Sequence, residues 1–423
     1  MRHSGSQTWA SMTTSADAKT EPRHRWYWVK EGFSPLLVQA AIQSEDCTST
    51  DLVVDPFCGS GTVPVEAARR QIRSAGAEVN PFLAFVSRAK TLTPSTDSIT
   101  AWSEQARVEI TRGTHSPLIG FSTFSSNAEE NGLFTSEVLM GFQSGWQSLR
   151  TAPPSTRDLL RLCLLRAASD CANFSRDGKA LRYRESLIER KFAREDLEKA
   201  FCLRAREAIE DIDTDEAPLT TPHIELTDSR KYLSDHFKEF KLCVTSPPYL
   251  NSFDYTDIYR PELFLGGFVQ SSKALRDLRY RTVRSHVQAS WQLPVESDFG
   301  PLYEECHEAI KAEREKLWDR RIPEMIQAYF EDLRGVLRSL RSLARPDATV
   351  WLIVSTSVYA GVAVPVDLIA AHVGTQVGWS LRDVNVLRHL RSSGQHQRKL
   401  SAAGKEGVAR LRESLVILDA NPK

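Results

Sequence analysis

The sequence predicts an α/β protein built on a doubly wound, Rossmann-like sheet, with large helical insertions and a closing antiparallel pair of strands near the carboxyl end. A short apolar run at 52–54 leads into a turn that contains Gly59 and Gly61, and a helical pattern follows the turn. A second short strand then ends in the acidic residue Glu78. Strand, glycine-rich turn, helix, strand and acid in this order are typical of the start of such a sheet.

The remaining strands are expected farther along the chain. The alternating pattern resumes at residues 223–226 and continues with the apolar runs at 241–244 and 349–354. Apolar runs of this length, bounded by polar residues, favour buried strands over helices. Two later segments are expected to pair antiparallel and close the sheet, 382–387 and 413–418.

Two long segments interrupt the alternation of strands and helices. Residues 100–215 are rich in Leu, Arg, Ala and Glu at helical spacing, which predicts a mostly helical insertion over 101–219. Polar stretches at 125–131 and 151–156 are expected to break its helices. The second insertion, at 250–345, is expected to contain a charged helix over 302–343.

The main α/β domain is therefore expected at 23–100 and 220–423, on either side of the first insertion. Residues 1–22 are rich in Ser, Thr and Ala, and we expect a disordered tail there. The segment lacks the apolar centre of a signal peptide, and no apolar run of the chain approaches the roughly 20 residues of a membrane helix.

Composition excludes some classes of function. The 54 basic and 54 acidic side chains balance, so any surface for nucleic acid must be local. The seven cysteines are scattered and form no CxxC pair, which favours reduced thiols in a cytoplasmic protein and argues against a zinc site. No metal is expected.

The turn at 55–62 is a candidate ligand site. Gly59 and Gly61 allow a tight turn and close approach of a ligand to the backbone, and the following helix offers free N–H groups. Glu78 lies 16 residues after Thr62, where a carboxylate can accept both hydroxyls of a ribose. An ordinary strand–helix turn is the alternative. The turn has no Walker lysine, so the acid points to an adenosine-containing cofactor rather than to a phosphate-binding loop.

Residues 245–249 read Thr-Ser-Pro-Pro-Tyr, directly after a strand candidate. Two prolines fix the backbone and leave carbonyl groups without competing N–H donors. With the hydroxyl of Ser246 before them and the ring of Tyr249 after them, the loop suits a flat, polar ring held by its edge and its face. This arrangement indicates transfer to an exocyclic amino group of a base. The alternative is a plain Pro-Pro loop with a packed tyrosine.

Taken together, segments 55–62 and 245–249 resemble the S-adenosylmethionine-dependent DNA amino-methyltransferases, which modify the N4 of cytosine or the N6 of adenine. Shorter matches frame the chain from about 24 to 418 and comprise Phe33-Ser34-Pro35-Leu36, Glu78-Val79-Asn80-Pro81, Asp228 and Leu411-Arg412-Glu413-Ser414. The resemblance implies a Rossmann-like methyltransferase sheet, S-adenosylmethionine as cofactor and double-stranded DNA as partner, with the target base flipped out of the duplex.

The resemblance also implies roles for individual residues. Ser246, Pro247 and Tyr249 would hold the target base. The cofactor would be held by Phe33, Asp55, Phe57, Cys58, Gly59, Gly61, Thr62, Glu78 and Asp228, although a helix cap is an equal alternative for Asp228. Serine at 246 is commoner among N4-cytosine enzymes, and Asp or Asn there among N6-adenine enzymes. Cys58 and Cys243 are placed badly for the nucleophile of a cytosine-C5 enzyme.

Three basic segments are candidate DNA contacts, and the first two lie in the insertions that could read the target sequence. They hold Asn173, Arg176, Lys179, Arg182 and Tyr183; then Arg276, Arg279, Arg281 and Arg284; and finally Arg382, Arg388, Arg391, Arg398 and Lys399. A solvated hairpin tip is the alternative for the residues of the last segment, and the isolated His389 and His396 favour no metal. The resulting hypothesis is a site-specific cytosine-N4 DNA methyltransferase of a restriction-modification system. An adenine-N6 enzyme, an RNA methyltransferase and a non-catalytic nucleic-acid binder are the alternatives.

Overall fold

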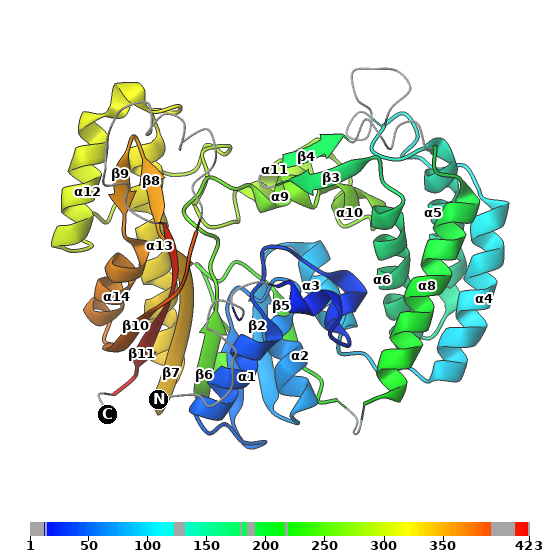
Figure 1. The fold of residues 1–423 in the computed structure, drawn as a ribbon, viewed down its shortest axis with the longest axis horizontal. Coiled ribbons are helices and arrows are strands. Elements are labelled where there is room, and N and C mark those ends of the chain that lie inside the picture. Colours follow the sequence, from blue (N-terminus) through cyan, green and yellow to red (C-terminus); the bar gives the residue numbers. More distant parts are fainter. Residues whose placement is uncertain are drawn as a thin grey trace.

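The computed structural model describes residues 12, 15–121, 132–177, 180–183, 191–215, 219–390 and 411–421. Its centre is a seven-stranded sheet in the order β10-β11-β7-β6-β1-β2-β5 (Figure 1). Five strands are parallel neighbours: β1 (Leu52–Asp55), β2 (Arg73–Glu78), β5 (His223–Leu226), β6 (Phe240–Thr245) and β7 (Ala344–Ser355). The last two strands are β10 (Ser380–His389) and β11 (Arg412–Asp419), and β11 pairs antiparallel with both β7 and β10.

The strand order reverses beside β1. The chain moves from β1 through β2 to β5 in one direction, then returns to place β6 on the other side of β1 and β7 beyond it. In open α/β sheets ligands bind outside the carboxyl ends of the strands at such a switch point. The predicted doubly wound sheet and its antiparallel closing pair are confirmed. In addition, β11 inserts between β7 and β10, which the sequence did not predict.

Helices cover both faces of the sheet because successive strand residues point to opposite faces. Val53 packs on one side with α1 (Pro35–Ser44) and α2 (Thr62–Arg69). Val54 packs on the other side with α13 (Ile322–Leu343) and α14 (Val366–Gln376). Strands buried on both faces are typical of parallel sheets. The helix α3 (Pro81–Ala89) follows β2 and begins at an Asn80 cap.

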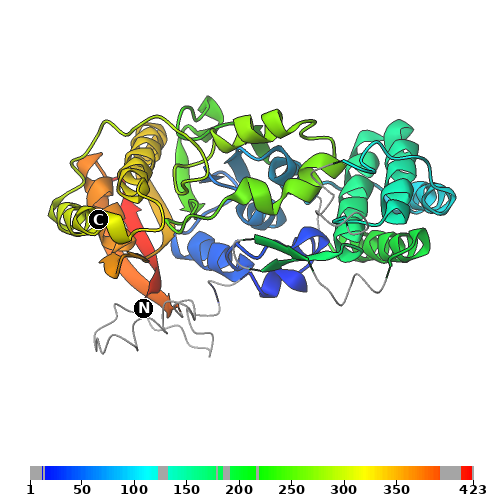
Figure 2. The same ribbon diagram turned by 90° about the horizontal axis from the view of Figure 1, so that it is seen from above.

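The segment between β2 and β5 forms a helical lobe beside the sheet (Figures 1 and 2). It contains α4 (Thr96–Arg112), α5 (Ser136–Ser148), η4 (Leu149–Thr151), α6 (Pro154–Asp170) and α8 (Arg194–Asp213). A hairpin of β3 (Phe174–Asp177) and β4 (Ala180–Tyr183), not expected from the helical spacing, interrupts them. Leucines of α6 and Phe201 of α8 share an apolar core that reaches Phe82 of α3, so the lobe is packed against the sheet domain. The polar break predicted at 125–131 lies outside the described residues.

The segment after β6 is more broken than expected. It contains α9 (Tyr255–Ile258), α10 (Arg260–Leu265), α11 (Ser272–Arg279), α12 (Pro301–Ala312) and η6 (Arg314–Lys316) before α13. The single helix predicted over 302–343 is wrong. It is split between α12 and α13, and Pro323 in the first turn of α13 has no N–H to continue a preceding helix.

Short elements complete the described chain: η2 (Asp17–Lys19), η3 (His24–Tyr27), η5 (Asp235–Phe237), β8 (Ser357–Tyr359) and β9 (Val362–Val364). Residues 15–22, within the predicted disordered tail, make defined contacts. The Ser15 hydroxyl donates to the Lys30 carbonyl at 3.0 Å, and the Ser34 hydroxyl donates to Asp17 at 3.0 Å. Within the described residues, every helix is too short or too polar to cross a membrane.

Gly61 is expected to tolerate no side chain. Its φ is +86°, and a Cβ there would lie 2.5 Å from the Ser87 hydroxyl and 2.9 Å from the Ser87 Cα. Gly61→Ala should lower the free energy of unfolding by about 1–2 kcal/mol for the backbone conformation. Overpacking against α3 should add about 1–3 kcal/mol. Gly267→Ala is the matched control, because Gly267 has φ +67° but open space around it. Equal losses in urea denaturation would contradict the close approach to Ser87.

Candidate active site

The carboxyl ends of β1, β2 and β6 open into one cavity. It brings together segments that lie almost two hundred residues apart in sequence, the turn after β1 and the loop after β6. The predicted site residues that line it are Phe33, Asp55, Phe57, Cys58, Gly59, Thr62, Glu78, Asp228, Ser246, Pro247 and Tyr249. Gly61 does not line the cavity, because it faces α3 instead.

Asp55 joins the two motifs. Its Oδ1 accepts a hydrogen bond from the Thr245 hydroxyl at 2.6 Å and another from the Phe57 N–H at 2.9 Å. The carboxyl group is 1% exposed, and burial raises its pKa to about 7. The last residue of β6 is therefore fixed relative to the turn after β1, and the loop beginning at Ser246 starts from a defined position.

Glu78 closes the turn from the side of β2. Its Oε2 accepts from the Gly59 N–H at 2.9 Å and its Oε1 accepts from the Asn80 N–H at 2.8 Å. Burial raises the pKa of this carboxyl group to about 7. Each oxygen keeps a further lone pair, so the group can still accept hydroxyl hydrogens from the cavity.

The cavity suits the adenosine-containing donor that the motifs imply. Gly59 has φ +49°, and a Cβ on it would meet no atom closer than the Phe57 carbonyl oxygen at 3.9 Å, so the backbone is open to a ligand there. Glu78 provides acceptors for a ribose, and Phe33 and Phe57 provide apolar walls. These features fit S-adenosylmethionine.

The Tyr249 hydroxyl donates to Glu413 at the start of β11. Glu413 also accepts from Arg388 of β10 at 2.7 Å. Burial, followed by the nearby Glu413 carboxylate, raises the pKa of Tyr249 well above its usual range. Sequence reasoning missed Glu413 as a partner of the loop at 245–249, because no local pattern links it to residue 249.

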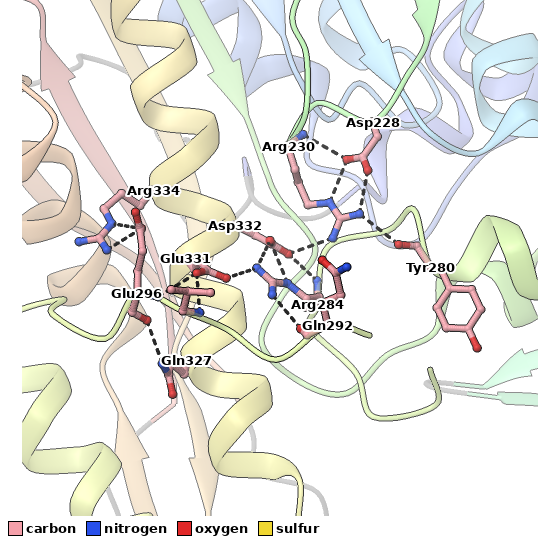
Figure 3. Close-up of polar contacts among 11 residues, drawn as sticks. Asp228, Arg230, Tyr280, Arg284, Gln292, Glu296, Gln327, Glu331, Asp332 and Arg334 are labelled. Carbon is pink, nitrogen blue, oxygen red and sulfur yellow. Dashed lines mark hydrogen bonds and ion pairs between the residues drawn. The ribbon is translucent and has the colours of Figure 1, made fainter. Parts of the chain in front are cut away.

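Asp228 lines the cavity but is already paired. Its carboxylate accepts two hydrogen bonds from the Arg230 guanidinium, at 2.9 and 2.7 Å, and Arg230 reaches Asp332 of α13 at 3.2 Å (Figure 3). The alternative of a helix cap is wrong, because the residues after Asp228 form a turn closed by the Lys231 N–H on the Asp228 carbonyl. Cys58 and Cys243 are buried, and burial raises the pKa of both thiols well above the ordinary value.

Several predicted DNA contacts are occupied inside the protein. Arg176 pairs with the buried Glu262, Arg382 pairs with Glu45 and Asp419, and Arg388 pairs with Glu413. In the described conformation these three guanidinium groups are held by carboxylates of the protein, and their contacts with DNA stay predictions. Arg279 and Arg284 are likewise paired, whereas Arg276 and Arg281 are exposed. Lys179, Arg391, Arg398, Lys399 and His396 lie outside the described residues.

One group of potential metal ligands was missed. His223 Nε2 lies 2.9 Å and His236 Nδ1 3.7 Å from Glu225 Oε1, and the two imidazole rings stack with centroids 3.5 Å apart. The three residues lie at the edge strand β5 and in η5, and none of them lines the cavity. Only the His-x-Glu spacing of residues 223 and 225 could have signalled the group.

Comparison with known proteins places this site in a family context. The RMKL-like methyltransferase domain, UPF0020, matches residues 23–128. The type II methyltransferase M.BsoBI of Geobacillus stearothermophilus is 25% identical over 94% of this chain and 86% of its own length. M.AvaI of Nostoc sp. is 24% identical over 87% of this chain and 81% of its own length.

Among solved structures, the rRNA methyltransferase aviRa of Streptomyces viridochromogenes is similar over 92% of this chain and 85% of its own, with 13% identity and a TM-score of 0.32. TrmN of Thermus thermophilus is similar over 92% of this chain and 49% of its own, with 10% identity and a TM-score of 0.28. The fold assignment rests on the strand order given above.

The sheet, the cavity and the related proteins together define the class: the chain is an S-adenosylmethionine-dependent methyltransferase with a Rossmann-like fold. The resemblance to this class, expected from the two motifs, is confirmed, and the identity of the methylated base stays a prediction.

The protonation of Glu78 predicts a pH dependence of stability. Its pKa is about 7 in the folded protein and about 4.3 in an unfolded chain. Between about pH 5 and 7 the unfolded state has released a proton that the folded state retains, so stability falls as pH rises, by up to about 1.4 kcal/mol per pH unit. Glu78→Gln should lack this component, and the difference between the two free energies of unfolding should vary with pH. The exposed Glu104→Gln is the control; a wild-type curve parallel to that of Glu78→Gln would contradict the shifted pKa.

Proposed function

We propose that the protein is a site-specific DNA methyltransferase that methylates the N4 exocyclic amine of cytosine, as the modification enzyme of a restriction-modification system. The observation that carries the proposal is the single cavity that joins Gly59 and Glu78 to the loop of Ser246, Pro247 and Tyr249. Neither motif alone indicates a reaction. A cofactor site that shares a cavity with a loop able to bind a flat, polar ring indicates transfer of a methyl group to that ring.

The loop acts on the amine through hydrogen bonds. An exocyclic amine is a poor nucleophile, because its lone pair is delocalised into the ring. The Ser246 hydroxyl oxygen and the Pro247 carbonyl would accept its hydrogens and favour tetrahedral nitrogen with a localised lone pair. Bound S-adenosylmethionine would supply a methyl group already activated by the sulfonium. Placement therefore supplies most of the catalysis, as expected for transfer between two held groups.

Glu78 and the backbone at Gly59 would hold the donor, with Phe33, Asp55, Phe57, Cys58 and Thr62 around it. Gly61 would act by shaping the turn, and Asp228 through its place in the wall of the cavity. Tyr249, held through its hydroxyl by Glu413, would stack on the base. A base within a duplex cannot enter such a cavity, so the protein would extrude it.

DNA as the substrate is supported by the two type II methyltransferases, because the similarity spans more than four-fifths of each. Serine at position 246 favours cytosine N4. Adenine N6 is the second candidate, because the acceptors at Ser246 and Pro247 would suit either amine.

The decisive test is expression in a bacterial host that lacks its own DNA methylation, followed by mass spectrometry of nucleosides from DNA and RNA. N4-methylcytosine in DNA is expected, and Ser246→Ala should abolish it. Ser103→Ala, at a half-buried position of α4 that does not line the cavity, is the matched control and should keep the mark. N6-methyladenine alone would overturn the proposed base, and a mark confined to RNA would overturn DNA as substrate.

Tyr249 is expected to act mainly through its ring. Tyr249→Phe keeps the ring and loses the bond to Glu413, whereas Tyr249→Ala loses both. Because stacking on a base contributes about 1–3 kcal/mol, Tyr249→Ala should lower kcat/KM by about ten- to hundredfold. The loss of kcat/KM in Tyr249→Phe should be several-fold smaller than the loss in Tyr249→Ala. Equal losses in a single-turnover methylation assay would mean that the hydroxyl, and not the ring, is the essential group.

A further inference from the structure

The cavity has a wall that the two sequence motifs do not account for. It is formed by the segment between α11 and α12, through Arg281, Thr282, Val283, Ser285 and His286. We infer that this segment binds the extruded target nucleotide, with Ser285 and His286 on the polar edge of the base and Arg281 on the adjoining phosphate. The inference rests on the proposed function and adds binding residues to it.

Ser285 and His286 present unused hydrogen-bonding atoms. Their side chains are 1% and 2% exposed, and both line the cavity. The Ser285 hydroxyl and the His286 Nδ1 are buried without a hydrogen-bond partner in the described structure. Buried polar atoms are rarely left unpaired, because the loss of water costs about 1–3 kcal/mol each. A polar ligand in the cavity would satisfy both.

The hydrogen bonds of Thr282 indicate which partner His286 needs. The Thr282 hydroxyl donates to the Arg279 carbonyl at 2.8 Å, so its oxygen accepts from the His286 Nε2 at 3.1 Å. Burial lowers the pKa of His286, which favours the neutral ring. With the proton on Nε2, Nδ1 is an acceptor. It suits an N–H of the base, while the Ser285 hydroxyl can donate to a neighbouring ring nitrogen or carbonyl oxygen.

Arg281 gives the wall a place for an anion. Its side chain is exposed at the cavity, and its guanidinium has no hydrogen bond or ion pair within the described part of the chain. Neighbouring Arg279 and Arg284 are instead paired with carboxylates. An unpaired guanidinium beside a pocket suits phosphate. A nucleotide of DNA offers a phosphate to Arg281, and the methionine carboxylate of S-adenosylmethionine is the competing anion, which the affinity for S-adenosylmethionine measured without DNA separates from it.

The wall is held rigidly from behind. Arg284 donates to Asp332 at 2.6 Å and to Glu331 at 2.5 Å. Asp332 also accepts a hydrogen bond from Arg230, and Arg230 in turn pairs with Asp228 (Figure 3). This chain of ion pairs connects the segment to α13 and to the turn after β5.

Two further hydrogen bonds hold the backbone carbonyl groups of the wall segment. The Ser252 N–H donates to the Ser285 carbonyl at 3.0 Å, which ties the wall to the chain just beyond Tyr249. The Trp291 indole N–H donates to the His286 carbonyl at 3.0 Å. Ser285 and His286 are thus positioned relative to the catalytic loop before any ligand binds.

The test uses two synthetic DNA duplexes that contain the sequence methylated by the wild-type enzyme, as mapped in modified DNA. One duplex carries the target base and the other an abasic residue in its place. Ser285→Ala and His286→Leu should weaken binding of the intact duplex by about ten- to hundredfold. Both should bind the abasic duplex as the wild type does. His286→Gln, which keeps an acceptor, should recover part of the loss.

Arg281→Ala should weaken binding of both duplexes and lower the slope of log K against log salt by about one, as expected for one lost phosphate contact. Arg73→Ala is the matched control, because Arg73 is exposed at the start of β2, outside the three candidate DNA-contacting segments, and does not line the cavity. Calorimetric affinity for S-adenosylmethionine without DNA should stay within about twofold in Ser285→Ala, His286→Leu and Arg281→Ala.

Weakened cofactor binding in Ser285→Ala and His286→Leu would assign the wall to the cofactor and overturn the inference. Equal losses on the intact and abasic duplexes would reduce these residues to a structural role and also overturn it. If the wild type leaves DNA unmarked, the proposed function fails first. If the wild type marks DNA and the variants bind it normally, only the inference fails.

Discussion

The site depends on the hydrogen bond between Asp55 and Thr245. These residues end β1 and β6, the two strands on either side of the point where the sheet order reverses. The same carboxyl group holds the Phe57 N–H, so a single buried side chain sets the turn after one strand against the loop after the other. Without that constraint, the distance between the methyl donor proposed at Glu78 and the amine proposed at Ser246 would not be fixed. Methyl transfer depends on the alignment of these two groups.

Buried charges extend this constraint to the outer parts of the chain. An isolated charge in the interior is strongly unfavourable, and several buried or half-buried arginines of this chain are matched by carboxylates. Arg230 and Arg284 share Asp332, which fixes the wall segment against α13. Arg388 and Tyr249 share Glu413, which fixes the catalytic loop against the antiparallel edge of the sheet. Of the arginines that were candidates for DNA contact, Arg284 and Arg388 therefore brace the site from within, whereas Arg281 lines the cavity without a carboxylate partner.

Local sequence was informative where a short segment carries its own constraint. The parallel strands β1, β6 and β7 follow apolar runs, because a strand buried on both faces needs little sequence context, whereas β2 and β5 were predicted from their place in the alternation of strands and helices. Some residues could be singled out from the sequence, because few others can adopt their backbone conformation or offer their carboxyl group at that place. They are Gly59, Glu78, Pro247 and Pro248. The split of the helix expected at 302–343 shows the limit of this reasoning: charge and spacing suggested one helix, and Pro323 decided the break.

The sequence by itself predicted the parallel strands, the glycine-rich turn with its acid and the Thr-Ser-Pro-Pro-Tyr loop, since each of these is written in short segments of the chain. Only the tertiary structure decided that β11 lies between β7 and β10, that Gly61 faces Ser87 rather than the cavity, and that Ser285 and His286 line the same cavity as Ser246. The physical reason is that these are contacts between segments far apart in the chain. No local sequence pattern shows that a serine or a histidine in a loop will be buried without a hydrogen-bond partner. This becomes visible only in the packed structure.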